Sequence, residues 1–181
     1  QIPQELAAWV VSMDLEAWGK VNPPLRRRAD REVLFQAFCR GDVPMLATDH
    51  APHAPEEKER GFGEAPSGVP GVETGFSMLL ALVKRGFLPL AVLLKAACLT
   101  PARTFGVNKG EIAEGRDADL VVVDPREIVR IKGKEMHSKC GWTPYEGREA
   151  LFPQAVFLRG RLVLKDGSVQ EEGRGREVPY G

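Results

Sequence analysis

The sequence has no net charge, because its 25 basic and 25 acidic residues cancel. Nucleic acids and anionic membranes attract surfaces with an excess of Lys and Arg, so we expect neither as a main partner. No apolar run reaches the roughly 18 residues that indicate a membrane-spanning helix. The N-terminus also lacks the basic and then apolar stretches of a signal peptide, so none is expected.

Cysteine is scarce, and the three cysteines of the chain lie far apart. Cys39, Cys98 and Cys140 form no Cys-x-x-Cys pair, which argues against a disulfide framework and a zinc knuckle. We therefore expect a protein of the reducing cytoplasm. The 181 residues, 43% of them apolar, suffice for one domain or slightly more with a sizeable core.

The first part of the chain alternates between helical and strand-like patterns. We expect helices over 4–18, from Asp30 to Gly41, and over 72–85, 89–98 and 100–105, with strands ending at 19–21 and covering 43–48. Such alternation indicates βα units of a parallel sheet or barrel. Residues 54–71 lack a periodic pattern, and loops of this length are usually functional lids or disordered.

The second part reads as β structure. Residues 119–124, 155–158 and 161–164 are predicted strands, the last two joined by an Arg-Gly turn, and Asp166-Gly167 is a further turn. The sequence thus predicts an α/β protein divided into residues 1–105 and 106–181.

The sharpest candidate site is Asp49-His50-Ala51-Pro52-His53, directly after a predicted strand. Active sites of parallel α/β folds lie at the carboxyl ends of strands. A carboxylate there can ligate a metal and shuttle protons. The alternative is that Asp49 caps a loop and the histidines are surface residues.

Two further clusters are weaker when each is taken alone. Asn22-Pro23-Pro24 could bind a polar planar ligand through Asn22, or could be a rigid turn. In Ala65-Pro66-Ser67-Gly68 the glycine permits close backbone approach to a ligand, although for this motif alone an ordinary turn is the simpler explanation. His137 lies in a lysine-rich stretch and is expected at the surface.

Together, these motifs and the strand Ala118 to Asp124 resemble dihydroorotase of the long bacterial class, in the amidohydrolase superfamily. The resemblance runs nearly end to end. It implies a (β/α)8 metal-dependent hydrolase barrel with a small β-sandwich domain, and interconversion of N-carbamoyl-L-aspartate and L-dihydroorotate in pyrimidine synthesis. Residues 1–105 would be the last βα units of the barrel, and residues 106–181 the C-terminal segment of the sandwich.

The resemblance also implies roles for individual residues. Asp49 would be the catalytic carboxylate and a metal ligand, moving a proton between a metal-bound hydroxide and the amide nitrogen. Asn22 and His53 would bind the substrate, and Ser67 and Gly68 would contact it through backbone groups. His50 matches the motif, but only a supporting role behind the metal ligands can be assigned to it.

This chain lacks the other ligands that the resemblance requires. It has three histidines and no His-x-His pair, so the remaining ligands for the expected pair of zinc ions would come from elsewhere. We expect a C-terminal portion that exposes apolar faces and needs its N-terminal partner segment to fold. A homodimer and association with aspartate carbamoyltransferase are further expectations.

Two alternatives stay open. A dihydroorotase-like protein that has lost metal ligands could be a non-catalytic partner of aspartate carbamoyltransferase. A hydantoinase or allantoinase would share the Asp-His pair, but those enzymes typically lack a histidine where His53 stands and usually differ at Asn22.

Overall fold

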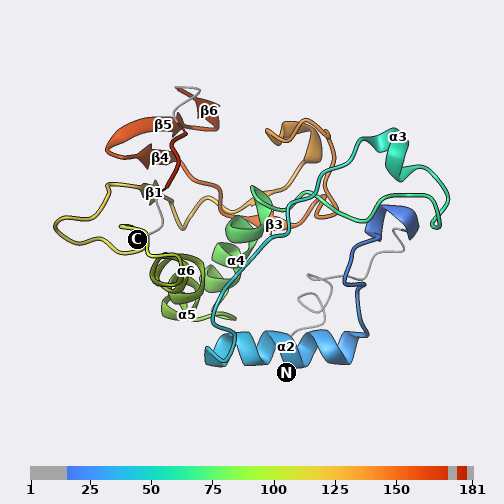
Figure 1. Ribbon diagram of the computed structural model, residues 1–181, viewed down its shortest axis with the longest axis horizontal. Helices are drawn as coiled ribbons and strands as arrows, with labels where there is room; N and C mark the ends of the chain where they lie inside the picture. The colour runs from blue at the N-terminus through green and yellow to red at the C-terminus, as the bar shows by residue number, and fades with distance from the viewer. Residues whose placement is uncertain (1–15, 171–174, 179–181) are drawn as a thin grey trace.

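The computed structural model describes residues 16–170 and 175–178, and shows helices packed beneath a small antiparallel sheet (Figure 1). The predicted helix over 4–18 lies mostly outside these residues. The helical elements are η1 (Glu16–Gly19), α2 (Arg28–Arg40), α3 (Pro55–Lys58), α4 (Thr74–Lys84), α5 (Leu90–Leu94), η2 (Lys95–Leu99), α6 (Thr100–Thr104) and η3 (Gly133–Glu135). None of these helices is long and apolar enough to cross a membrane.

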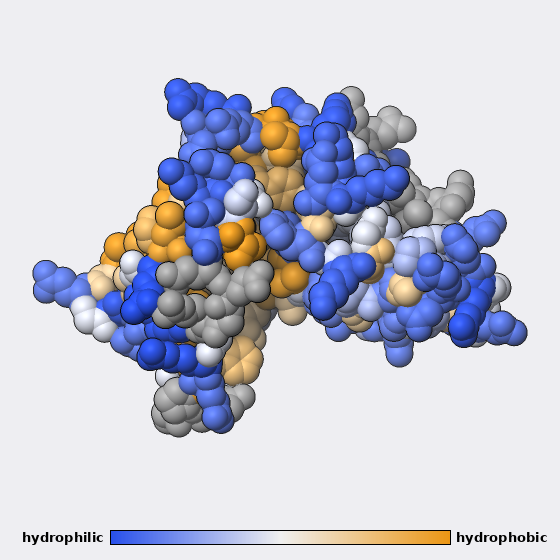
Figure 2. Space-filling model, turned by 90° about the horizontal axis from the view of Figure 1, so that it is seen from above, coloured by the Kyte–Doolittle hydropathy of each residue, from blue (hydrophilic) through white to orange (hydrophobic). Residues whose placement is uncertain are grey.

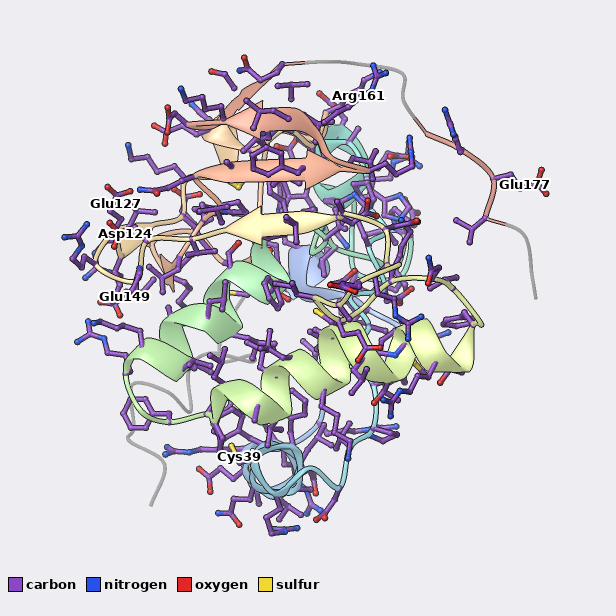
Figure 3. The ribbon with its side chains drawn as sticks, turned by 90° about the vertical axis from the view of Figure 1, so that its left-hand side faces the viewer. Cys39, Asp124, Glu127, Glu149, Arg161 and Glu177 are labelled. Carbon is purple, nitrogen blue, oxygen red and sulfur yellow. The ribbon has the colours of Figure 1, made fainter. Side chains whose placement is uncertain are left out.

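Helix α4 lies at the centre of the molecule and contributes to two apolar clusters. On one side Leu82 packs with Phe38 of α2 and Leu93 of α5. On the other side Met78 packs against Ile131 and Ala150. Because both sides of α4 carry apolar residues, one helix links the N-terminal helices to the segments that follow residue 120 (Figures 1 and 3).

Helix α2 confirms the predicted helix and corrects its start. It begins at Arg28 instead of after Asp30, and the Asp30 carboxylate accepts a hydrogen bond from the Arg27 N–H at 3.1 Å. A carboxylate in the first turn satisfies an amide that has no partner within the helix. Gly41 ends the helix with φ 81°, as predicted.

The two predicted helices over 89–98 and 100–105 join into one helical run, α5–η2–α6. Its middle, η2, widens to π geometry, with the Thr100 N–H donating to the Lys95 carbonyl. Pro101 has no N–H to continue this register onto the Ala96 carbonyl. The Leu46 N–H donates to that carbonyl at 3.0 Å instead, and so ties segment 43–48 to the helix.

The four-stranded sheet is antiparallel, with order β1-β4-β5-β6. Its strands are β1 (Leu120–Val122), β4 (Ala155–Leu158), β5 (Arg161–Lys165) and β6 (Ser168–Val169). The Arg-Gly and Asp-Gly turns form as predicted, and all four of their residues have positive φ. The predicted strands over 119–124, 155–158 and 161–164 are thus confirmed, the first in shortened form.

The predicted strands at 19–21 and 43–48 are wrong, because neither segment forms a strand in the structure. A strand requires a hydrogen-bonded neighbour, and the described residues provide only an isolated parallel bridge between His50 and Val69. A short antiparallel pair, β2 (Val129–Arg130) with β3 (Glu149–Ala150), was not predicted from the sequence. Figure 3 shows Glu149 at the edge of this region, where its carboxylate pairs with Arg85 at 2.6 Å.

Large apolar side chains are exposed on several elements, as expected. They include Val33 and Leu34 of α2, Leu90 and Leu94 of α5, and Val121 and Val122 of β1. Figure 2 shows apolar surface gathered between hydrophilic regions on one face. That the chain needs a further segment to fold stays a prediction.

Gly110 and Gly115 offer a matched test of packing next to η2 and α6. Both have positive φ. A Cβ on Gly110 would lie 2.6 Å from the Ala102 Cβ and 2.6 Å from the Cys98 carbonyl oxygen, whereas a Cβ on Gly115 would have no heavy atom of the described residues within 4 Å. We expect Gly110→Ala to lower the free energy of unfolding by about 1–3 kcal/mol more than Gly115→Ala. Equal losses in chemical denaturation would contradict this packing.

Candidate active site

Three segments that carry the candidate residues are joined by backbone hydrogen bonds. The Gly68 N–H donates to the Lys20 carbonyl at 2.9 Å, two residues before Asn22. Two residues after Asp49, the Ala51 N–H donates to the Val69 carbonyl at 3.1 Å. The segment that contains Ser67 and Gly68 therefore connects the Asn22 loop to the Asp49–His53 motif.

His53 lies against this central segment. Its Nε2 is 3.1 Å from the Ser67 carbonyl oxygen, and its Nδ1 is 3.8 Å from Glu57 Oε2. The imidazole is 27% exposed, so it has one face toward protein and another accessible to a ligand. With one donor-or-acceptor nitrogen on each side, the ring is oriented by its neighbours.

Gly68 has to be glycine for this contact to form. Its φ is 137°, and a Cβ there would lie 2.6 Å from the Ala51 carbonyl oxygen and 3.1 Å from His53 Nε2. Any larger residue would displace the His53 ring or the Ala51 backbone. Gly68 therefore lets its backbone lie close to Ala51 and His53, and its expected contact with a ligand stays a prediction.

His50 points to a different place. Its Nδ1 accepts hydrogen bonds from the N–H groups of Gly71 at 3.0 Å and Val72 at 3.3 Å. An accepting Nδ1 places the proton of a neutral ring on Nε2. His50 thus holds the turn that leads into α4, and its expected role behind the metal ligands stays a prediction.

Asp49, Asn22 and Ser67 are exposed at the surface of this region. Asp49 has φ 45°, a left-handed conformation that Asp tolerates better than most residues. Within residues 16–170 and 175–178, no side chain or backbone group forms a hydrogen bond or ion pair with its carboxylate. The carboxylate is therefore available to a ligand.

The candidate residues can supply one ligand of a metal site, but they do not complete such a site. A catalytic zinc ion takes about three protein ligands, drawn from His, Cys, Asp and Glu. The described part of the chain contains no group of three such residues that could hold a metal ion. Asp49 can supply one oxygen ligand, and the other ligands would have to come from outside the described residues.

Sequence reasoning missed two residues that support the site. The Trp142 Nε1–H donates to the His53 carbonyl at 2.8 Å, although 89 residues separate them. Lys58 is fully buried, and its ammonium lies 6.0 Å from the centre of the Trp142 ring. Trp142 also stacks edge-on with Trp18, with ring centroids 4.8 Å apart. Neither residue lies in a periodic pattern or a motif, so no signal in the sequence distinguished them.

Comparison with known proteins gives the family. The model of the Amidohydrolase family matches residues 21–163. The chain belongs to the amidohydrolase family.

The amidohydrolases most informative for this chain are archaeal dihydroorotases. The dihydroorotase of Halobacterium salinarum is 45% identical over 166 residues, covering 91% of this chain and 39% of the relative. That of Methanosarcina acetivorans is 42% identical over 165 residues, covering 89% of this chain and 35% of the relative. The resemblance to dihydroorotase is therefore confirmed, although these relatives are archaeal. The chain spans 35% to 40% of the length of the dihydroorotases it matches.

Solved amidohydrolase structures share the fold of this chain. The L-hydantoinase (dihydropyrimidinase) of Arthrobacter aurescens superposes with a TM-score of 0.84 at 29% identity, covering 92% of this chain and 39% of that one. A D-hydantoinase (dihydropyrimidinase) from Thermus sp. gives a TM-score of 0.81 at 32% identity, covering 86% and 36%.

A second histidine contact ties the start of α4 to the later part of this amidohydrolase chain. His137 Nδ1 lies 2.8 Å from Glu73 Oε1, and the His137 N–H donates to Glu73 Oε2 at 2.9 Å. His137 is 47% exposed, as its sequence context predicted. The hydrogen bond to Glu73 raises the pKa of His137 above its ordinary value, although partial burial opposes the shift.

This contact predicts a pH-dependent contribution to stability. Because the folded-state pKa of His137 is raised, its stabilisation is fully present below the unfolded-state pKa and is lost as the pH rises through the folded-state value. We expect His137→Ala to cost more unfolding free energy at about pH 5.5 than at about pH 9. A pH-independent cost in urea denaturation would contradict this role, and Glu73→Gln should reproduce the loss at low pH.

Proposed function

We propose that this chain is the C-terminal part of a zinc-dependent dihydroorotase that interconverts N-carbamoyl-L-aspartate and L-dihydroorotate in pyrimidine biosynthesis. The observation that carries the proposal is the hydrogen-bonded convergence of the Asn22, Asp49–His53 and Ser67–Gly68 segments. The Asp49 carboxylate is available beside them. The similarity to dihydroorotases over about nine-tenths of this chain supports the choice of substrate.

The corresponding fold would be a (β/α)8 barrel, with residues 1–105 as its last βα units and 106–181 as part of a β-sandwich domain. Segments 19–21 and 43–48 would become barrel strands once neighbouring strands offer hydrogen-bond partners. Residues 20–21 and 44–48 belong to no helix or strand in this chain and are partly exposed, which leaves them open to such pairing. The exposed apolar residues on α2 and α5 would face neighbours in the complete fold.

Asp49 would act as both metal ligand and proton carrier. A bound zinc ion would supply Lewis acidity and make water a stronger nucleophile at neutral pH. In the hydrolytic direction the Asp49 carboxylate would take a proton from the attacking nucleophile and deliver it to the departing amide nitrogen. In the biosynthetic direction the same carboxylate would move the proton the opposite way.

His53, Asn22, Ser67 and Gly68 would bind the substrate. The imidazole of His53 has an accessible face; with its Nε2–H directed at the Ser67 carbonyl, its Nδ1 in the doubly protonated ring would donate to the substrate carboxylate. The Asn22 amide can donate and accept, which suits a planar ring with amide groups. The backbone at Ser67 and Gly68 would contact the same ring, because the glycine lets the chain approach closely.

A hydantoinase-type activity is the second candidate, favoured by the solved structures that share this fold. Hydantoin and dihydrouracil carry no carboxylate for His53 to bind, so the two activities separate by substrate. A non-catalytic partner of aspartate carbamoyltransferase would require the remaining metal ligands to be missing. We regard homodimer formation and that association as further proposals about the whole protein.

The proposal is tested by hydrolysis of L-dihydroorotate, hydantoin and dihydrouracil by the complete polypeptide that carries this sequence. Turnover of L-dihydroorotate at a higher kcat/KM than the other two substrates is the expected result. Preference for hydantoin or dihydrouracil would select the second candidate. No turnover of any of the three, with zinc supplied, would contradict a catalytic function.

Replacing Asp49 tests the proton carrier. Asp49→Asn should reduce kcat by about 100- to 10,000-fold, because the amide cannot accept and release the proton. Asp42→Asn is the matched control, since Asp42 is exposed and pairs only with Arg40 among described residues. Near-unaltered kcat in folded Asp49→Asn protein would remove Asp49 from the mechanism.

Replacing His53 tests substrate binding. His53→Ala should raise KM for L-dihydroorotate by roughly 10- to 150-fold, because it deletes one charge-assisted hydrogen bond. His137→Ala serves as the histidine control outside the site and should leave KM unaltered in folded protein. An unaltered KM and an unaltered equilibrium affinity in His53→Ala would exclude this role.

A further inference from the structure

Lys58 is enclosed by protein, with none of its surface exposed to solvent. Its Nζ donates to three backbone carbonyls: Pro66 at 2.9 Å, Gly68 at 3.2 Å and Lys20 at 3.3 Å. These carbonyls use all three ammonium protons. The three acceptors belong to the two segments that carry Asn22 and the Ser67–Gly68 pair.

Burial of an ammonium group carries a cost that the contacts of Lys58 offset only in part. Burial lowers the pKa of Lys58, and the charge of Lys20 lowers it further. No carboxylate of the described residues forms an ion pair with Lys58, so carbonyl dipoles and the Trp142 ring provide its stabilisation. Because burying the Lys58 ammonium destabilises the fold, we look for a role of this group that an apolar side chain could not have.

The geometry of the peptide group indicates that task. In a trans peptide the carbonyl and the following N–H point in opposite directions. Because the Pro66 carbonyl points toward Lys58, the Ser67 N–H points away from it, toward the exposed side of the segment. No described group accepts a hydrogen bond from that N–H. The Ser67 carbonyl, in turn, lies 3.1 Å from His53 Nε2.

We propose that Lys58 is a positioning residue for the substrate carboxylate. Its ammonium draws the Pro66 and Gly68 carbonyls inward, and so presents the Ser67 N–H and the His53 imidazole side by side to the ligand. This inference rests on the proposed function and adds to it a residue that does not touch the substrate. Trp142 holds the His53 backbone as well, because its Nε1–H donates to the His53 carbonyl.

The test compares Lys58→Met with the conservative variant Lys58→Arg and with Lys134→Met, an exposed lysine control, in the complete polypeptide. Two quantities are measured for each: KM and kcat for L-dihydroorotate, and hydrogen exchange of the Gly68 amide without ligand. Lys58→Met should raise KM by about tenfold or more and change kcat by less than about threefold. It should also accelerate Gly68 exchange, because the carbonyls that flank this amide lose their anchor.

Lys58→Arg should recover part of the affinity, since the guanidinium keeps the charge and the donors. Lys134→Met should alter neither quantity. If Lys58→Met does not fold, Lys58→Gln, which keeps two donors and loses the charge, is held to the same criteria. Unaltered KM together with unaltered Gly68 exchange would overturn the proposal, as would a loss of kcat at constant KM.

The exchange measurement separates this proposal from the proposed function. If the unaltered protein does not hydrolyse L-dihydroorotate, the proposed function is wrong, and Gly68 exchange alone decides whether Lys58 anchors the segment. Faster exchange in Lys58→Met would support the anchor, and unaltered exchange would reject it.

Discussion

The hydrogen bonds along residues 66–72 determine where the other candidate residues lie. On one side, the Gly68 N–H binds the Lys20 carbonyl and fixes the approach to Asn22. On the other side, Val69 forms a parallel β-bridge with His50, directly after Asp49. The turn at Gly71 is held by His50 before α4 begins. Displacement of this one segment would alter every part of the candidate site.

The surrounding packing gives this segment a rigid base. Helix α4 starts directly after it and is held between two apolar clusters, one with α2 and α5 and one with Ile131 and Ala150. The hydrogen bond from Leu46 to the Ala96 carbonyl fixes segment 43–48, which leads to Asp49. Pro101 has no N–H to donate to the Ala96 carbonyl, so that carbonyl is available to Leu46. The helix thereby holds the segment that leads to Asp49.

Local signals in the sequence predicted much of the fold. Gly41 ends α2, and the Arg-Gly and Asp-Gly turns place β4, β5 and β6, because short-range backbone preferences decide these features. The apolar character of 43–48 predicts a strand there, and the position of 19–21 before a double proline predicts the end of another. The two segments form no strand, because strands depend on partners distant in sequence, and no pattern within a segment reveals whether a partner is present.

The site shows the same division. Asp49, His53 and Gly68 are candidates from the sequence because they stand in short motifs with unusual chemistry. Lys58 stands in a Glu-Glu-Lys-Glu-Arg cluster, which is equally typical of an exposed charged loop. Trp142 contacts His53 across 89 residues of sequence, so no local pattern indicates the contact. Buried polar anchors of this kind are defined by the carbonyls that converge on them, and the convergence exists only after folding.

We propose that the 20–22, 49–53 and 66–69 segments together form one side of the substrate-binding site. A crystal structure of the complete polypeptide with bound L-dihydroorotate tests it most directly. We expect the ligand carboxylate within hydrogen-bond distance of His53 and the Ser67 N–H, and the ring amide near Asp49. A ligand bound elsewhere, or with its carboxylate away from His53, would show that these segments do not bind the substrate.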